Sequence, residues 1–438
     1  MSGRKLLMTF PVTPTSHLLT EVRKRGGYET LKRVLTSMTP EQVTKEVTAS
    51  GILGHGGAAF PVGRKWSVIQ LADNQPHYLC VNADEGEPGT FKDRWILENS
   101  PHQLVESMVI AAYALQVRNA FVYIRGEFDL PYRRLQGAVD EAYDAGLLGE
   151  RILGTDFSCD IVVYRGAGSY VCGEASALIT SIEGKKGYPR NRPPRLTVRG
   201  LYQRPTVINN VESISNVEVI VRLGAEEFRK VGVAKSPGTQ LVSISGHVAK
   251  PGVYEVEYGY PLAKFIYEDC GGVLGGRKLK CIIPGGISTK VLTDADISTV
   301  TYDHKAMEAV GSQVGSGGMV VIAEGTCMVR LLQVMLRFYH HESCGQCTPC
   351  REGMGWMHRI IDRIVAGKGR PEDIDALVRI SEANDGTTIC GMGDAAGFAT
   401  VGIIAKYRDE FEYYIANGRS KCGGVLEVDA PLQEMAHA

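Results

Sequence analysis

Four cysteines have the spacing of an iron-sulfur site. Cys344, Cys347 and Cys350 stand three residues apart in the run Cys-Gly-Gln-Cys-Thr-Pro-Cys, and Cys390 follows much later in the chain. Three thiolates from one tight turn can converge on one centre, and a remote fourth completes the four-cysteine ligation of a 4Fe-4S cluster. Zinc also takes four thiolates, but structural zinc sites usually combine two cysteine pairs, so zinc is the weaker alternative. The chain must fold back to bring Cys390 to the other three.

The other cysteines occur singly. An odd total of 11 in a long chain argues against a disulfide scaffold, so we expect a reducing compartment. We expect each of the seven to be a small buried apolar side chain. They are Cys80, Cys159, Cys172, Cys270, Cys281, Cys327 and Cys422.

A glycine-rich loop offers a place for a phosphate or a flat ring. The run Gly-His-Gly-Gly-Ala-Ala at 54–59 fits G-x-G-x-x-A, but a helical pattern precedes it, so we do not expect a conventional Rossmann turn. Its glycines still allow backbone N–H groups to face a ligand, and Arg64 and Lys65 follow with matching charge. A second glycine loop at 165–170 follows a strand pattern and leads into a helical one.

Two charged loops are further candidates for binding. The run Asn-Ala-Asp-Glu-Gly-Glu-Pro-Gly at 82–89 comes directly after a strand pattern, where α/β folds place ligands, although a solvated turn has the same composition. Between Lys185 and Arg204 there are seven basic residues and no acidic one. This segment suits a pyrophosphate or an acidic partner protein, and a solvated basic loop is the plain alternative.

The hydrophobic patterns predict an α/β layer followed by two smaller parts. Strand patterns at 77–81, 120–124 and 161–164 alternate with helical patterns at 103–115 and 132–145. We predict N-terminal helices with an α/β domain over 1–237 and a small α+β module of β-grasp type over 238–325. A four-helix bundle over 326–438 follows from patterns at 328–339, 353–365, 372–383 and 396–415.

Composition and hydropathy limit the protein class. Lys plus Arg total 48 and Asp plus Glu total 49, a net charge of -1 that disfavours a nucleic-acid-binding or disordered chain. No run reaches the roughly 18 apolar residues of a membrane span, and the first residues lack a signal-peptide core. We therefore expect a cytoplasmic chain, or one bound peripherally to the cytoplasmic face of the inner membrane within a complex.

Five ordered motifs carry a resemblance to a known family. They are Gly-His-Gly-Gly-Ala-Ala-Phe-Pro-Val-Gly-Arg-Lys-Trp at 54–66, Asn-Ala-Asp-Glu-Gly-Glu-Pro-Gly-Thr-Phe-Lys-Asp-Arg at 82–94, Gly-Ala-Gly-Ser-Tyr-Val-Cys-Gly-Glu at 166–174, Ile-Asn-Asn-Val-Glu at 208–212, and Glu-Ser-Cys-Gly-Gln-Cys-Thr-Pro-Cys-Arg-Glu at 342–352. Together they resemble the flavin-bearing, NADH-oxidising subunits of respiratory complex I and their relatives in soluble hydrogenases and formate dehydrogenases.

The resemblance implies a Rossmann-like FMN domain, a ubiquitin-like (β-grasp) module and a helical bundle that carries the cluster. It also implies FMN, one 4Fe-4S cluster and a nicotinamide dinucleotide lying against the flavin. It places the cluster on Cys344, Cys347, Cys350 and Cys390. It places FMN contacts on Gly54, Gly56, Gly57, Lys65, Asn82, Asp84, Tyr170, Gly173, Glu174, Asn209 and Asn210. It places dinucleotide contacts on Phe60, Glu85 and Glu87, of which the two glutamates are the catalytic candidates in an orienting role.

The implied function is electron input: NADH gives hydride to FMN, and single electrons pass to the cluster and onward within a complex I type assembly. The implied partners are a thioredoxin-like 2Fe-2S subunit and further iron-sulfur subunits. One alternative is a diaphorase subunit of a soluble hydrogenase, formate dehydrogenase or bifurcating complex. Another is a zinc-stabilised scaffold without flavin.

Three positions depart from the pattern that the family implies. Val68 and Arg195 stand where aromatic residues are expected, and Ala175 stands where a second glutamate is expected after Glu174. A carboxylate that would repel a 2′-phosphate is therefore missing, while Arg192 and Arg195 add positive charge nearby. NADP(H) is thus an alternative substrate, with NAD(H) as the leading expectation.

Overall fold

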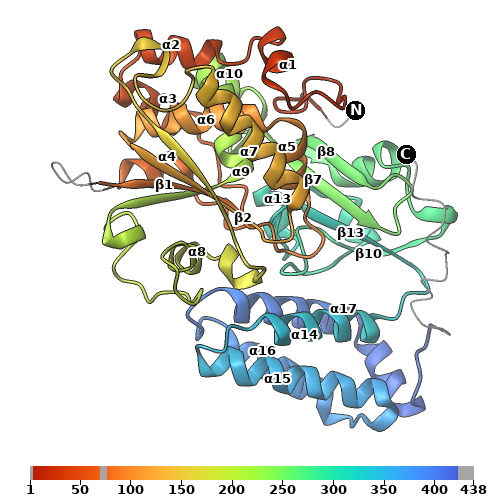
Figure 1. Ribbon diagram of the computed structural model, residues 1–438. Coiled ribbons are helices and arrows are strands. Elements are labelled where there is room, and N and C mark those ends of the chain that lie inside the picture. Colours follow the sequence, from red (N-terminus) through yellow and green to blue (C-terminus); the bar gives the residue numbers. More distant parts are fainter. Residues whose placement is uncertain (1–2, 70–75, 423–438) are drawn as a thin grey trace.

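A four-stranded parallel sheet forms the centre of the N-terminal half (Figure 1). The computed structural model describes residues 3–69 and 76–422. The strands are β1 (Tyr78–Ala83), β2 (Asn119–Ile124), β3 (Asp160–Arg165) and β4 (Thr206–Asn210), in the order β3-β2-β1-β4. All three pairings are parallel. The three predicted strands are confirmed, and the chain is a mixed α/β protein with a Rossmann-like parallel sheet.

Both faces of this sheet are covered, which explains why its strands contain long apolar runs. Leu79, Val81 and Ala83 of β1 point into one core, whereas Cys80 points into a second core on the opposite face. The first core includes α6 (Pro101–Ala114), α7 (Asp129–Asp144) and α9 (Val211–Leu223). The second core includes α8 (Ala175–Ile182). The helices predicted at 103–115 and 132–145 are confirmed as α6 and α7.

Short helices precede and connect the strands. They are α1 (Leu19–Lys24), α2 (Glu29–Ser37), α3 (Pro40–Ser50), α4 (Val62–Ser67), α5 (Lys92–Asn99) and α10 (Ala225–Arg229), with 3₁₀ turns η1 (Ile152–Gly154), η2 (Tyr170–Gly173) and η3 (Leu201–Gln203). Helix α3 begins with a capping box in which Thr39 and Gln42 exchange side-chain and backbone hydrogen bonds.

A second sheet follows, in the order β11-β10-β13-β7-β8. Its strands are β7 (Thr239–Gly246), β8 (Gly252–Glu257), β10 (Leu279–Ile283), β11 (Leu292–Thr293) and β13 (Gly318–Ala323). β7 and β8 form an antiparallel hairpin, and β13 returns to pair with β7 in parallel. This sheet has its own core, separate from those of the first sheet.

Small elements complete this part. Two-stranded pairs join β5 (Gly232–Val233) to β6 (Ser236–Pro237) and β9 (Tyr260–Pro261) to β12 (Thr301–Tyr302). The helical segments are α11 (Leu262–Lys264), η4 (Phe265–Asp269), η5 (Leu274–Gly276), α12 (Asp294–Ile297) and α13 (His304–Ala309). Helix α11 continues directly into η4, which has π geometry.

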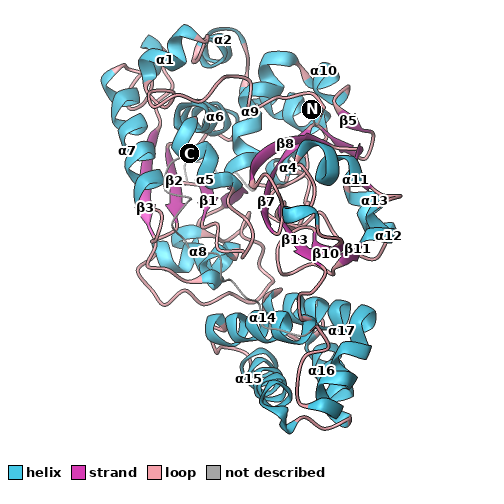
Figure 2. Cartoon of the chain, turned by 90° about the vertical axis from the view of Figure 1, so that its right-hand side faces the viewer, coloured by secondary structure: helices cyan, strands magenta, loops and turns pink. Residues whose placement is uncertain are grey.

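The last part of the described chain is helical and lies below the two sheets in Figures 1 and 2. Its helices are α14 (Met328–Glu342), α15 (Thr348–Arg363), η6 (Ile364–Lys368), α16 (Glu372–Asn384) and α17 (Met392–Asn417). They share one apolar core, and the four predicted helical patterns are confirmed. Among the described helices, none combines the length and apolar character that a bilayer crossing needs.

One prediction about the single cysteines is wrong. Six of the seven are buried, but Cys422 is only half-buried. Its sulfur lies 3.5 Å from Lys280 Nζ and 3.7 Å from Glu410 Oε2, because it follows the end of α17 at the surface. Cys422 therefore has polar neighbours rather than an apolar pocket.

Candidate functional site

The order of the parallel strands creates a switch point between β1 and β4. The chain runs from β1 outward through β2 and β3, and then returns to place β4 on the other side of β1. Asn82 and Asn210 are paired at the carboxyl ends of these two strands. Open α/β sheets bind ligands in the crevice outside such a point. Asn82, Asp84, Asn209 and Asn210 are thus brought together by topology.

The first glycine loop lies against the same point. The N–H of Gly54 donates to the Phe60 carbonyl at 3.0 Å and closes the loop between α3 and α4. Gly57 has a φ of +104°, which favours glycine. A Cβ added to Gly56 would lie 3.2 Å from Asn210 Cβ. The loop thus approaches β4 closely without being a strand-to-helix turn, as the sequence indicated.

Lys65 supplies an uncompensated positive charge here. Its Nζ donates to the Ile208 carbonyl at 2.6 Å, and it forms no ion pair within the described residues. Burial, and then the neighbouring charge of Arg192, lower the pKa of Lys65 to about 8. An ammonium group has three N–H donors, so two remain available for an anion. This surplus fits the phosphate of FMN.

Asp84 has a buried oxygen without a partner. Its backbone N–H donates to Asn82 Oδ1, and its Oδ2 accepts no hydrogen bond among the described groups. Burial raises the pKa of this carboxyl to about 7. A buried unpartnered acceptor is costly unless a ligand fills it, so this atom also fits a bound cofactor that offers a donor.

Glu85 and Glu87, the two catalytic candidates, both have protein partners. Glu85 is buried, and its two oxygens accept from the N–H groups of Asp93 and Arg94 at 2.8 and 3.0 Å, so it caps the start of α5. Glu87 Oε2 accepts from the Tyr170 hydroxyl at 2.6 Å, and its Oε1 accepts from the Ser288 N–H at 2.8 Å. Burial raises the pKa of both carboxyls. A direct contact of either glutamate with a dinucleotide stays a prediction.

The second glycine loop leads to Glu174, which caps α8. Glu174 Oε2 accepts from the N–H groups of Ser176 and Ala177, and its Oε1 lies 3.0 Å from Arg192 Nη2. The Gly173 carbonyl accepts from Asn82 Nδ2 at 2.8 Å, which ties this loop to β1. At the edge of the site, Phe60 is 44% exposed, and Arg64 lies over its ring at 5.8 Å from the centroid.

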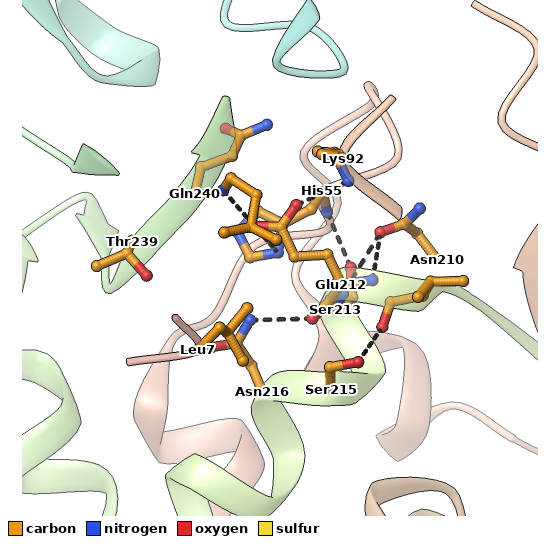
Figure 3. A network of polar contacts seen from close by, with 12 residues as sticks. Leu7, His55, Lys92, Asn210, Glu212, Ser213, Ser215, Asn216, Thr239 and Gln240 are labelled. Carbon is orange, nitrogen blue, oxygen red and sulfur yellow. Dashed lines mark hydrogen bonds and ion pairs between the residues drawn. The ribbon is translucent and has the colours of Figure 1, made fainter. Parts of the chain in front are cut away.

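A buried charge network behind the loops was not predicted (Figure 3). Lys92 Nζ lies 2.8 Å from Asp93 and 2.7 Å from Glu212, with all three side chains almost fully enclosed. Glu212 Oε1 also accepts from the Leu241 N–H of β7 at 2.7 Å, while Asn210 Nδ2 donates to Asp93. The network therefore joins both sheets to the asparagine pair at the switch point.

His55 lies in the same network as a neutral group. Its backbone N–H donates to Ser213 Oγ at 2.9 Å, and its Nδ1 lies 3.9 Å from Glu212 Oε1. Burial, and then Lys92, lower the pKa of His55 to about 3. Its buried ring also stacks on Tyr258, with centroids 6.3 Å apart. The only sequence signal for the network is charged residues inside apolar helical patterns, which does not identify their partners.

The four candidate cluster cysteines come from two helix starts. Cys347 precedes α15 and Cys350 lies in its first turn, while Cys344 is in the preceding loop and Cys390 lies just before α17. Helix N-termini stabilise negative charge, which suits thiolates around iron. Cys344 and Cys390 both pack against the α8 core, so the fold brings the distant Cys390 to the same boundary as the first three.

The chemistry of these four side chains fits an iron-sulfur centre. In the described part of the chain, no three His, Cys, Asp or Glu side chains are already grouped closely enough to hold a single metal ion. Four soft thiolates are the ligand set of a 4Fe-4S cluster, in which each thiolate binds a different iron.

Tyr170 connects the two sites. Its hydroxyl donates to Glu87, and its N–H donates to Glu342 Oε2 at 3.2 Å, two residues before Cys344. Its ring also meets Phe338 of α14, with centroids 5.2 Å apart. The loop that borders the switch point thus touches the helix that leads to the cysteines.

Comparison with protein families matches three consecutive regions. The Nuo51 FMN-binding domain matches residues 47–219, the SLBB domain matches 240–322, and the NADH-ubiquinone oxidoreductase-F iron-sulfur binding region matches 330–414. Among solved structures, an NAD+-reducing NiFe hydrogenase in its H2-reduced state is similar, with a TM-score of 0.80 and 32% identity over 93% of this chain. This chain spans only 66% of that hydrogenase chain.

Curated relatives agree over nearly the full length. An F-type subunit of NADH-quinone oxidoreductase in Rhizobium meliloti (strain 1021) is 45% identical over 406 residues, which cover 93% of this chain and 96% of the relative. The F-type subunit of Mycobacterium tuberculosis (strain ATCC 25618 / H37Rv) is 46% identical over 396 residues, covering 90% and 88%. On this similarity, the chain belongs to the family of F-type subunits of NADH-quinone oxidoreductases.

Proposed function

We propose that this chain is the electron-input subunit of an NADH-quinone oxidoreductase, which oxidises NADH by hydride transfer to FMN and passes single electrons to a 4Fe-4S cluster. The observation that carries this proposal is the contact of Tyr170 with Glu87 on one side and Glu342 on the other. It places the FMN-binding region and the iron-sulfur region, both identified by family matches, in direct contact within one chain.

The protein's part in this chemistry is to bind and to orient. When bound, FMN links the two-electron chemistry of a nicotinamide to the one-electron chemistry of an iron-sulfur cluster. Lys65 neutralises phosphate charge, and the loop at Gly56 and Gly57 allows a close backbone approach. Asn82, Asp84, Asn209 and Asn210 border the rest of the flavin site. Cys344, Cys347, Cys350 and Cys390 hold the cluster.

The dinucleotide enters from the exposed rim. Phe60 offers an aromatic face there, and Arg64 lies over that face at 5.8 Å from the ring centroid. Glu87, held by Tyr170 and Ser288, orients the substrate. Glu85 acts behind it by fixing the start of α5. NADH is the substrate that the relatives' names indicate, and NADP(H) is the alternative suggested by Ala175 and Arg192.

The division into three domains is part of this proposal. Residues 1–237 contain the parallel sheet with its helices. Residues 238–325 have a hairpin, a helical segment and a returning strand that pairs in parallel with the first, which supports a β-grasp module. Residues 326–438 include the four helices around one core, which supports a helical bundle that carries the cluster.

The assembly is proposed from the family. We infer a multi-subunit complex with a thioredoxin-like 2Fe-2S subunit and further iron-sulfur subunits, located in the cytoplasm or on the cytoplasmic face of the inner membrane. A second candidate is a diaphorase subunit, which the similarity to the NAD+-reducing hydrogenase favours. Affinity purification of the native complex decides between them: membrane-bound quinone-reducing subunits support the first, and a hydrogenase or formate dehydrogenase subunit supports the second.

The function is tested by anaerobic purification with analysis of cofactors. We expect about one FMN and about four irons per chain, together with NADH-dependent reduction of ferricyanide. Bound zinc without flavin would contradict the proposal and support the scaffold alternative.

A further inference from the structure

A basic pocket lies beside the proposed flavin site and is not used by the proposed function. It has a volume of about 590 Å³ and is formed by the segment 180–203 together with Gln346. Five of its lining residues are cations: Lys185, Lys186, Arg190, Arg192 and Arg199. None of the residues that line it is acidic. Its volume lies within the range of about 300–1,000 Å³ that is usual for small-molecule sites.

Part of this charge is not neutralised by the protein. Lys185 and Arg190 share Glu183, at 3.2 and 2.8 Å. Lys186 and Arg199 form no ion pair with a carboxylate within residues 3–69 and 76–422. Lys186 instead lies 4.6 Å from the ring centroid of Tyr188, and Arg199 donates to Gln203. Two cations at one concave wall therefore lack an anion.

The position of the pocket connects it to both proposed centres. Arg192 lies on its wall and pairs with Glu174, a candidate flavin contact. Gln346 stands between Cys344 and Cys347 of the cluster loop. Arg195, which the sequence analysis grouped with Arg192, is exposed outside this lining. A ligand in the pocket would thus lie between the dinucleotide entrance and the cysteine loop.

We propose that this pocket binds the phosphomonoester group of a nucleotide. Guanidinium and ammonium donors on one wall match a compact dianion, and the uncharged polar side chains of Asn191 and Gln203 suit sugar hydroxyls. Two sources carry this group: the 2′-phosphate of NADP(H), or a free nucleotide that is not a substrate. The first source rests on the proposed function, whereas the binding itself does not.

Calorimetric titration of the purified flavin-containing complex with 2′,5′-ADP and with 5′-AMP tests the site. The double variant Lys186→Gln/Arg199→Gln should weaken 2′,5′-ADP or 5′-AMP binding at least about tenfold, since each lost charge-assisted hydrogen bond has an effect of this order. The matched control Lys45→Gln/Arg229→Gln removes the same charge from exposed positions outside the pocket and should leave binding unchanged.

The outcomes distinguish the 2′-phosphate of NADP(H) from a free nucleotide. They also distinguish failure of the pocket proposal from failure of the proposed function. If 2′,5′-ADP competes with NADPH oxidation and the pocket variant raises KM for NADPH but not for NADH, the 2′-phosphate is the ligand. If 5′-AMP binds without changing either KM, the ligand is a free nucleotide. No binding, or equal weakening in both double variants, overturns the pocket proposal. Normal flavin content and NADH–ferricyanide activity in that case would show that the proposed function stands without it.

Discussion

Lys92 Nζ lies 2.7 Å from Glu212 Oε2, and both side chains are enclosed between the two sheets. Burial disfavours the charge of Lys92, but Asp93, Glu212 and Glu85 together raise its pKa, so the ammonium is retained. Burial raises the pKa of Glu212. The pair therefore joins α5 to α9 directly behind the glycine loop.

Removing the lysine should destabilise the protein strongly. Lys92→Met leaves Asp93 and Glu212 buried without a cation, and the free energy of unfolding should fall by about 3–5 kcal/mol in urea titrations. The matched control is Arg94→Met, two residues away, whose pair with Glu98 is 54% exposed on the arginine side. The control substitution should lower the free energy of unfolding by less than about 1 kcal/mol. Equal losses in the two variants would contradict a special role for the buried pair.

Lys65 should determine FMN affinity. Lys65→Gln keeps a polar side chain, one atom shorter, but removes the charge that faces the switch point, so FMN binding should weaken by about tenfold or more. Equilibrium dialysis, with flavin fluorescence as the readout, measures the FMN affinity directly. The neighbouring Arg64→Gln variant, whose side chain is exposed, should retain FMN. Unchanged FMN affinity in Lys65→Gln would place the phosphate elsewhere.

Cys390→Ser should remove the cluster and spare the flavin. The serine oxygen is a poor ligand for iron, whereas none of the candidate flavin contacts comes from the segment before α17. Iron content and the EPR signal of the reduced protein should be lost, while FMN absorbance remains. Cys422→Ser is the control, because Cys422 lies beside Lys280 and Glu410 rather than at the cluster. Loss of iron from the control alone would refute the ligand assignment.

Glu106 should give the protein a pH-dependent stability. Burial, and then Glu218, raise the pKa of Glu106 from 4.5 to about 7, although the Tyr28 and Leu31 N–H groups donate to it. The folded state then holds a proton that the unfolded state releases above about pH 4.5, so stability falls as pH rises from there to about 7.

Replacement by glutamine isolates this effect. In the wild type, the free energy of unfolding should fall by about 1–3 kcal/mol as the pH rises from 4.5 to 7. In Glu106→Gln this fall should be absent. Thermal unfolding at several pH values measures it, with the exposed Glu226→Gln as the control. The same slope in wild type and Glu106→Gln would exclude Glu106 as its source.

Local sequence patterns predicted the helices and strands well. They did not predict which side chains distant in the sequence contact one another. The strand at β1 was recognisable because both of its faces are apolar, and the capping box at Thr39 is a purely local signal. The cysteine spacing and the glycine loop were also visible in the sequence. The contact of Lys92 with Glu212 was not, since periodicity does not show which buried charges meet.

The acidic loop at 82–89 shows a second limit of prediction from sequence. The resemblance places ligand contacts on Asp84, Glu85 and Glu87 alike, and the structure gives the three carboxylates different protein partners. Asp84 keeps an unpartnered oxygen, Glu85 caps α5, and Glu87 binds Tyr170. Whether a carboxylate meets a helix start or a ligand depends on where α5 begins in space, which no local motif encodes.

The attachment of Tyr170 to both Glu87 and Glu342 has a consequence for the speed of electron movement. Since the helical part is fastened to the α/β part at this residue, the gap that an electron must tunnel across is set by the fold and not by random encounter. Turnover should then respond little to solvent viscosity, and a variant that loosens the Tyr170 contacts should lower the rate steeply, because the rate of tunnelling falls exponentially with distance.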